Sequence, residues 1–107
     1  MEWLLSQYPH IDAVFAASDL IGLESVRVLA AEGLNVPDTV SVVGFDDIDA
    51  AGFTLPPLTT IRQDPVMMGR MAGRILLDRI LERITSKSPQ KVFLKPELVV
   101  RKSTAAV

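Results

Sequence analysis

Residues 40–47 constrain the fold more than any other stretch of this sequence. Residues 40–43 are an uncharged run rich in valine, typical of a strand buried on both faces in a parallel sheet covered by helices. The run stops at Gly44 and is followed by two acids, Asp46 and Asp47. In open parallel sheets, ligands bind beyond the carboxyl ends of the strands. The sequence therefore places two carboxylates where such a fold keeps its binding crevice.

A second apolar run, residues 13–17, ends in the same way, in Ser18 and Asp19. A helical pattern over residues 20–32, closed by Gly33, connects the two runs, and Asp19 is placed to cap it. This is one β-α-β unit, whose crossover is expected to be right-handed, so both strand ends open on the same side. The side chains expected to meet at that edge of the sheet are Ser18, Asp19, Asp46 and Asp47.

The composition argues against several classes of functional site. The chain has 107 residues, a hydrophobic fraction of 49% and a net charge of −2, which gives no support for nucleic-acid binding by this segment itself. It has no cysteine and one histidine, His10. A disulfide framework and a thiolate zinc site therefore lack their cysteines, and His10 is expected in a solvated turn at the strand entrance, opposite the carboxyl-end crevice, where a catalytic histidine is not expected. We expect neither a metal nor a cofactor.

No targeting or membrane segment is predicted. The first residues lack a basic stretch followed by a long apolar one, so no secretory signal is visible. No apolar run approaches the roughly 20 residues of a membrane span. These patterns favour a soluble, cytoplasmic protein.

The remaining segments carry weaker structural signals. Asp64 followed by Pro65 predicts a helix start, and the helical pattern continues to about residue 84. The tail, residues 103–107, is expected to fray. The other predicted elements are a short helical turn at 48–53 and strands at 59–61, 91–94 and 97–100.

Helix 20–32 carries more apolar surface than one contact with a sheet needs, since a single stripe is enough for that. The excess is explained either by a second subunit or by ordinary burial inside a larger domain. Phe53 and Leu55 are apolar groups on a connection, a placement that often marks a contact surface.

These segments, in this order, resemble the effector-binding core of the LacI/GalR family of bacterial transcriptional repressors. The resemblance covers nearly the whole chain, and the ordered set is more specific than any one motif. The matching pieces are residues 12–19, 33–37, 40–48, 56–64, 68–69 and 97–104.

The resemblance implies an α/β fold of two Rossmann-like lobes, of the periplasmic-binding-protein type I, hinged around a sugar or a nucleobase. A helix-turn-helix headpiece that binds operator DNA precedes those lobes in the family. This chain would be a truncated core without the headpiece. Residues 1–63 and 91–107 would belong to the C-terminal lobe, and residues 64–90 to the other.

The resemblance also assigns roles to residues. Asp46 matches the acid that accepts hydrogen bonds from the ligand, and Ser18 falls where many members have a ligand-binding asparagine. Asp47 matches a loop brace and Asp19 a helix cap, both structural. The implied function is a ligand-responsive, homodimeric transcriptional regulator without catalytic activity. The residues at positions implied to form the dimer contact are Leu20, Leu23, Arg27, Phe53 and Leu55.

Two alternatives compete with this interpretation. A phosphatase of the haloacid-dehalogenase type would use Asp47 and Asp49 after a buried strand, but no lysine lies between Asp49 and Lys87, and the motif continues differently. A periplasmic sugar-binding protein of a transporter shares the fold. The segment 56–60, Pro-Pro-Leu-Thr-Thr, favours the repressor.

Overall fold

The computed structural model describes residues 1–85 and 88–105, and the chain divides into two compact units. Unit 1 contains residues 1–63 and the segment from residue 97 onward, and unit 2 contains residues 64–96. Each unit is described by itself. Which lobe of a larger protein each unit represents stays a prediction.

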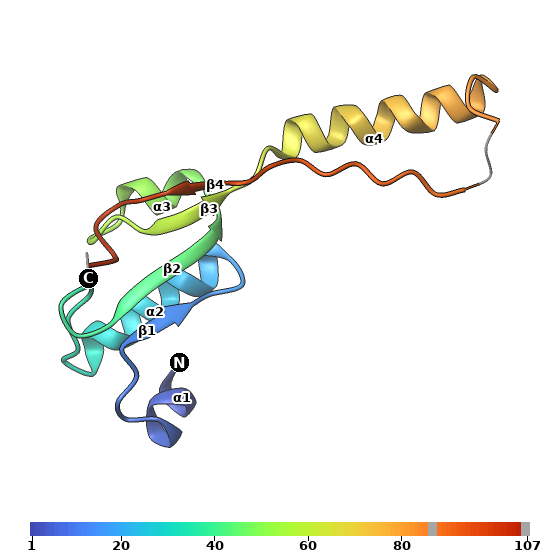
Figure 1. Ribbon diagram of the computed structural model, residues 1–107. Helices are drawn as coiled ribbons and strands as arrows, with labels where there is room; N and C mark the ends of the chain where they lie inside the picture. Colours follow the sequence, from blue (N-terminus) through green and yellow to red (C-terminus); the bar gives the residue numbers. More distant parts are fainter. Residues whose placement is uncertain (86–87, 106–107) are drawn as a thin grey trace. The chain divides into compact units, whose positions relative to one another are not determined.

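Unit 1 is an α/β layer built on a four-stranded sheet of order β1-β2-β3-β4 (Figure 1). The pairs β1–β2 and β2–β3 are parallel, and β4 is antiparallel to β3. The predicted α/β class with a parallel sheet is confirmed, and the structure adds β4 as an antiparallel strand at one edge. The elements of unit 1 are α1 (Glu2–Gln7), β1 (Ala13–Phe15), α2 (Asp19–Ala31), β2 (Ser41–Asp46), α3 (Asp49–Phe53), β3 (Thr59–Arg62) and β4 (Glu97–Val99).

The register of the sheet brings three strand ends to one edge. Val14 of β1 pairs with Val42 of β2, and Asp46 at the end of β2 pairs with Arg62 at the end of β3. Because β1, β2 and β3 are parallel, the segments that follow them leave the sheet on the same side. The predicted β-α-β unit is therefore present, with α2 as its crossover helix. Gly33, with φ of 74°, ends the turn after α2, as its sequence position predicts.

The hydrophobic core of unit 1 lies between α2 and one face of the sheet. β2 alternates, with Val42 and Gly44 buried while Val43 and Phe45 stay half-buried. The expectation that this strand is buried on both faces is therefore wrong for the described residues. The core residues that α2 and α3 contribute pack on the face of the sheet that carries Val42. The buried members of the core are Val26, Leu29, Val40, Val42, Ala51 and Leu58.

The tail of the chain does not fray where the structure describes it. Ser103 is fully buried, and its hydroxyl donates to the carbonyl of Val42 at 2.6 Å. The same oxygen accepts from the amide of Thr59 at 2.8 Å. The expected fraying is thus wrong for Ser103, because one hydroxyl bridges β2 and the start of β3. Residues 106–107 lie outside the described residues.

Unit 2 consists mainly of α4 (Pro65–Ile80), which begins where the sequence predicts. The Asp64 side chain accepts from the amide of Met67 at 2.7 Å, and Pro65 occupies the first helical position. The helix ends at Ile80, four residues before the predicted end. The strand expected at 91–94 is not formed, since a strand needs a hydrogen-bonded neighbour and none of the described segments pairs with it.

Candidate functional site

The end of β2 has an unusual backbone. Asp46 and Asp47 have φ angles of 115° and 58°, in the left-handed region that residues other than glycine seldom adopt. Such conformations cost on the order of 1–3 kcal/mol each and persist only where the surroundings impose them. Asp46 is exposed, and its Oδ1 accepts a hydrogen bond from Nε2 of Gln63 at 2.9 Å. A charged acceptor thus stands at the carboxyl edge of the sheet, open to solvent.

The side chain of Asp47 is held by two guanidinium groups. Arg62 at the end of β3 donates through Nε to Oδ2, and Arg101 after β4 donates through Nη2 to Oδ1, both at 2.6 Å. Burial raises the pKa of the Asp47 carboxyl, but the hydrogen bonds and charges of Arg101 and Arg62 outweigh it and hold the pKa below its ordinary value. Asp47 therefore stays ionised and has the geometry of the predicted loop brace.

Ser18, rather than Asp19, is the N-cap of α2. The Ser18 hydroxyl accepts from the amide of Ile21 at 3.4 Å, whereas Asp19 turns inward and is fully buried. Asp19 accepts from the amide of Ile48 at 2.8 Å and from the hydroxyl of Thr60. The expectation that Asp19 caps the helix is therefore wrong, because its carboxylate is engaged by the segment after β2 and by β3.

Asp19 brings the two predicted strand ends together. Its bond to Ile48 fixes the start of α2 beside the segment that follows Asp47. Its bond to Thr60 adds the third parallel strand to the same cluster. The sheet edge thus carries the four predicted polar residues on neighbouring segments. Ligand contact by Asp46 and Ser18 stays a prediction.

Two glycines allow α2 to approach the sheet this closely. A Cβ at Gly44 would collide with the carboxylate of Asp19 and would lie 2.8 Å from Leu58. A Cβ at Gly22 would lie 3.1 Å from the same leucine and 3.6 Å from the Cα of Gly44. The helix and the strand therefore meet almost backbone to backbone, and Asp19 occupies the space that a side chain at residue 44 would need.

Sequence reasoning missed the residues that hold the acids. Arg62 and Gln63 directly follow the predicted strand 59–61, so the rule that places Asp46 at the sheet edge also applies to them. The same rule does not point to Arg101, because Arg101 follows β4. The antiparallel pairing of β4 with β3, which brings Arg101 to this site, is visible only in the structure. Its guanidinium also donates to the carbonyl of Leu58 at 2.8 Å.

The residues predicted to form a dimer contact differ in exposure. Phe53 and Leu55 are 89% and 94% exposed, and Leu20 is 69% exposed, which is unusual for large apolar side chains. Leu23 is half-buried against the core, and Arg27 is exposed and paired with Glu24 at 2.6 Å. Their part in a dimer stays a prediction.

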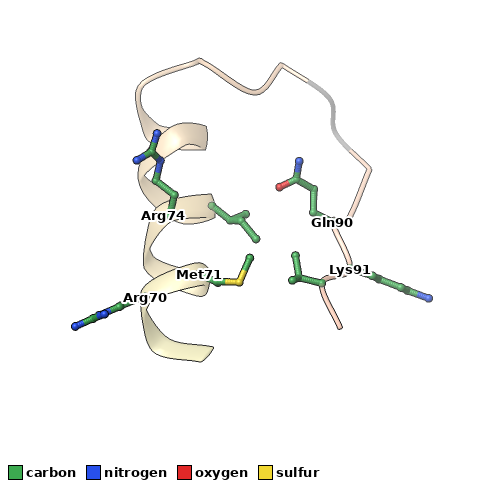
Figure 2. Close-up of a pocket in the computed structure, with 7 residues that line it drawn as sticks. Arg70, Met71, Arg74, Gln90 and Lys91 are labelled. Atoms are coloured by element: carbon green, nitrogen blue, oxygen red, sulfur yellow. The ribbon is translucent and has the colours of Figure 1, made fainter. Parts of the chain in front are cut away.

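Unit 2 has a cavity of about 410 Å³ between α4 and the extended segment that follows it. In Figure 2 the side chain of Met71 points into this cavity, whereas Arg70 and Lys91 extend away from it. Arg74 is engaged by Asp78, with its Nε at 2.9 Å from a carboxylate oxygen. The cavity therefore lacks the inward-facing charges of an anion site. The residues that line it are Arg70, Met71, Arg74, Ile75, Gln90, Lys91 and Val92.

Neither a cluster of metal ligands nor a membrane-spanning helix is present in residues 1–85 and 88–105. Within these ranges no group of three or more histidine, aspartate or glutamate side chains is placed to hold a metal ion. Over the same part of the chain, no helix combines the length and the apolar character needed to cross a bilayer.

Comparison with known proteins identifies the architecture. Residues 1–104 match the family model described as a periplasmic binding protein-like domain. The chain is 47% identical to the HTH-type transcriptional regulator CelR of Thermobifida fusca over 96% of its length, and 38% identical to the HTH-type transcriptional repressor PurR of Haemophilus influenzae (strain PittEE) over its full length.

Solved structures give the same result. The complex of the transcriptional regulator CelR with cellobiose superposes with a TM-score of 0.89 at 45% identity, over 95% of this chain and 31% of that one. The lac repressor dimer bound to operator and the anti-inducer ONPF gives a TM-score of 0.87 at 32% identity, over 97% of this chain and 35% of that one. The predicted lobe of periplasmic-binding-protein type is thus confirmed.

The chain spans only about a third of these relatives, 30% of CelR and 32% of PurR. Those relatives are transcriptional regulators, not enzymes. The family match nevertheless covers residues 1–104, almost all of this chain. The chain therefore belongs to the periplasmic-binding-protein-like domain family and corresponds to part of that domain in LacI-family transcriptional regulators.

Proposed function

We propose that this chain is part of a ligand-responsive, homodimeric transcriptional regulator that binds a small sugar through Asp46 and performs no catalysis. The observation that carries the proposal is the exposed carboxylate of Asp46 at the carboxyl edge of three parallel strands. A charged acceptor makes stronger hydrogen bonds to hydroxyl groups than a neutral one does. CelR has been solved with cellobiose, which favours a sugar over a nucleobase.

The proposed mechanism is a shift between lobe arrangements. Residues 1–63 and 91–107 would form one lobe, and residues 64–90 would contribute to the other. An effector that binds at the Asp46 edge favours one arrangement of the full-length regulator and thereby changes how strongly the dimer holds its operator. Operator DNA would be bound by a headpiece that is not among these 107 residues. The regulator would act in the cytoplasm.

Ser18 has a smaller part in this proposal. Its hydroxyl already accepts from the amide of Ile21, so the remaining hydrogen-bonding capacity is its proton and one lone pair. It can donate to an effector oxygen while capping α2. Asp46 is expected to contribute more binding free energy than Ser18, because it is the charged partner of the two.

Asp46→Ala is expected to weaken effector binding by about 10- to 100-fold, the equivalent of one hydrogen bond to a charged group. We would replace the matching segment of CelR by this chain and measure cellobiose affinity of the chimera by isothermal titration calorimetry. A thermal-shift screen of sugars and nucleobases on the same chimera would identify a preferred effector.

Asp49→Ala is the matched control, since Asp49 is an exposed acid three residues further along, at the start of α3. It should leave the affinity unchanged. An Asp46→Ala chimera that stays folded and binds the effector as well as its parent would refute the role of Asp46.

The phosphatase alternative conflicts with the geometry of Asp47. A nucleophilic carboxylate needs an oxygen free to attack, but each oxygen of Asp47 is bound by a different arginine at 2.6 Å. Its side chain is only 8% exposed. The regulator is therefore the function that the geometry supports best.

Phe53→Asp is expected to weaken self-association of the 107-residue chain. The proposed dimer surface consists of Leu20, Leu23, Arg27, Phe53 and Leu55, and a carboxylate among its apolar groups would be desolvated on association. Sedimentation velocity over a concentration series measures the effect. Leu76→Asp, on the exposed surface of α4, is the control. Loss of association in the control alone would assign the contact to α4 instead.

A further inference from the structure

The backbone conformation of the turn formed by Asp46 and Asp47 needs contacts from other residues to be stable. Both have left-handed φ angles, 115° and 58°, although neither is glycine. A conformation of this kind relaxes unless neighbouring groups impose it. The side chain of Asp46 can face an effector only while the turn keeps this shape, because the backbone angles set the direction of its Cβ.

The groups that impose the conformation come from β3 and from the segment after β4. Arg62 binds Asp47, and the next residue, Gln63, binds Asp46 at 2.9 Å. Two consecutive residues at the end of β3 thus hold two consecutive residues at the end of β2. The strands are in register there, since Asp46 and Arg62 are paired in the sheet.

Arg101 completes the arrangement from the other side of Asp47. Its own position is fixed twice, by a bond from Nη1 to the carbonyl of Leu58 at 2.8 Å and by its amide, which donates to the Thr59 hydroxyl at 2.9 Å. Arg62 is less constrained, with a side chain 48% exposed and a second contact to Glu97 at 3.3 Å. The side chain of Arg101 is therefore the more constrained of the two, and the side chain of Arg62 is the freer to move.

We infer that Arg62 and Arg101 are positioning residues for the effector-binding carboxylate, acting through Asp47 to keep the turn in its left-handed form. This inference rests on the function proposed for Asp46. Arg62 need not touch the effector. Its contribution is to keep Asp47 in place, so that Asp46 is presented in one orientation before binding instead of being ordered by it.

The first test measures the turn itself, without an effector. In the isotopically labelled 107-residue chain, scalar couplings and amide–Hα cross-correlated relaxation report φ at residues 46 and 47. Arg62→Gln should reduce the left-handed signature at Asp47, since Arg101 still holds the other carboxylate oxygen, and Arg62→Lys should keep more of it. Arg70→Gln, which removes the same charge from an exposed site on α4, should change nothing at the turn. An unaltered turn in Arg62→Gln would overturn the inference.

The second test uses the CelR chimera and cellobiose. Arg62→Gln should weaken binding roughly tenfold, within the range expected for relaxing one strained residue. Asp47→Gly adopts left-handed φ without help, so adding Arg62→Gln to it should have little further effect. Equal losses in both backgrounds would show that Arg62 does not act through Asp47, and would overturn the inference.

The two proposals fail in different ways. If Asp46→Ala leaves cellobiose affinity unchanged, the effector role of Asp46 is wrong, and the φ measurements still decide whether the arginines impose the turn. If Asp46→Ala weakens binding while Arg62→Gln alters neither φ nor affinity, the effector role stands and the positioning role is wrong. Asp47→Asn removes both ion pairs with little change in side-chain shape, so it should lose more of the left-handed signature than Arg62→Gln; an unaltered turn in Asp47→Asn would overturn the role of both arginines.

Discussion

Gly44→Ala is expected to lower the free energy of unfolding by about 3 kcal/mol, the upper part of the range for overpacking a core. The added methyl would collide with the carboxylate of Asp19 and would lie 2.8 Å from Leu58. Leu58 can change its rotamer, but Asp19 is held by the amide of Ile48 and the hydroxyl of Thr60. Moving Asp19 therefore breaks bonds as well as packing. Urea unfolding followed by circular dichroism measures the change.

Gly52→Ala provides the matched control in the same unit. Gly52 lies in α3, and the nearest atom to an added Cβ is Nη2 of Arg101 at 4.0 Å. Alanine is the better helix former, so this variant should be neutral or slightly stabilising. A Gly44→Ala protein with the urea midpoint of the control would mean that α2 does not approach β2 as closely as described.

Asp19→Ala is expected to be about as damaging, at about 3 kcal/mol. The change removes a fully buried acceptor and leaves the amide of Ile48 and the hydroxyl of Thr60 without their partner. Bonds to charged groups are worth roughly 1.5–3 kcal/mol each. Removing a buried carboxylate also relieves its desolvation, so the total stays below the sum of two such bonds. The same urea unfolding experiment measures the loss.

Two milder variants separate the contributions at this site. Thr60→Val removes one donor to the carboxylate and should cost about 1.5–2 kcal/mol. Asp19→Asn keeps the shape but turns one acceptor into a donor, so it should fall between Thr60→Val and Asp19→Ala. If Asp19→Ala were no worse than Thr60→Val, the bond to Ile48 would be contributing little.

The features that sequence reasoning predicted correctly depend on local patterns. The run at residues 40–43 and its acidic end gave the central strand, because β-branched residues without charge are typical of buried strands. Asp64 with Pro65 gave the start of α4, and Gly33 gave the end of α2, because both signals act within one turn of helix. The acid-bearing edge followed from the direction of parallel strands alone.

The features that were missed depend on partners far away in the chain. Arg101 meets Asp47 across 54 residues, and Asp19 meets Thr60 across 41, so neither contact leaves a local trace. Ser18 and Asp19 are both good N-cap residues, and only the buried partners of Asp19 decide between them. The strand expected at 91–94 has suitable residues, but strand propensity without a neighbouring strand does not make a sheet.

The bridging hydroxyl of Ser103 has a consequence for synthesis on the ribosome. It joins the carbonyl of Val42 to the amide of Thr59, so β2 and the start of β3 are linked by a residue made 61 positions after Val42. Long sequence separations of this kind slow folding. A nascent chain that has not yet reached Ser103 therefore lacks the hydroxyl that links β2 to the start of β3.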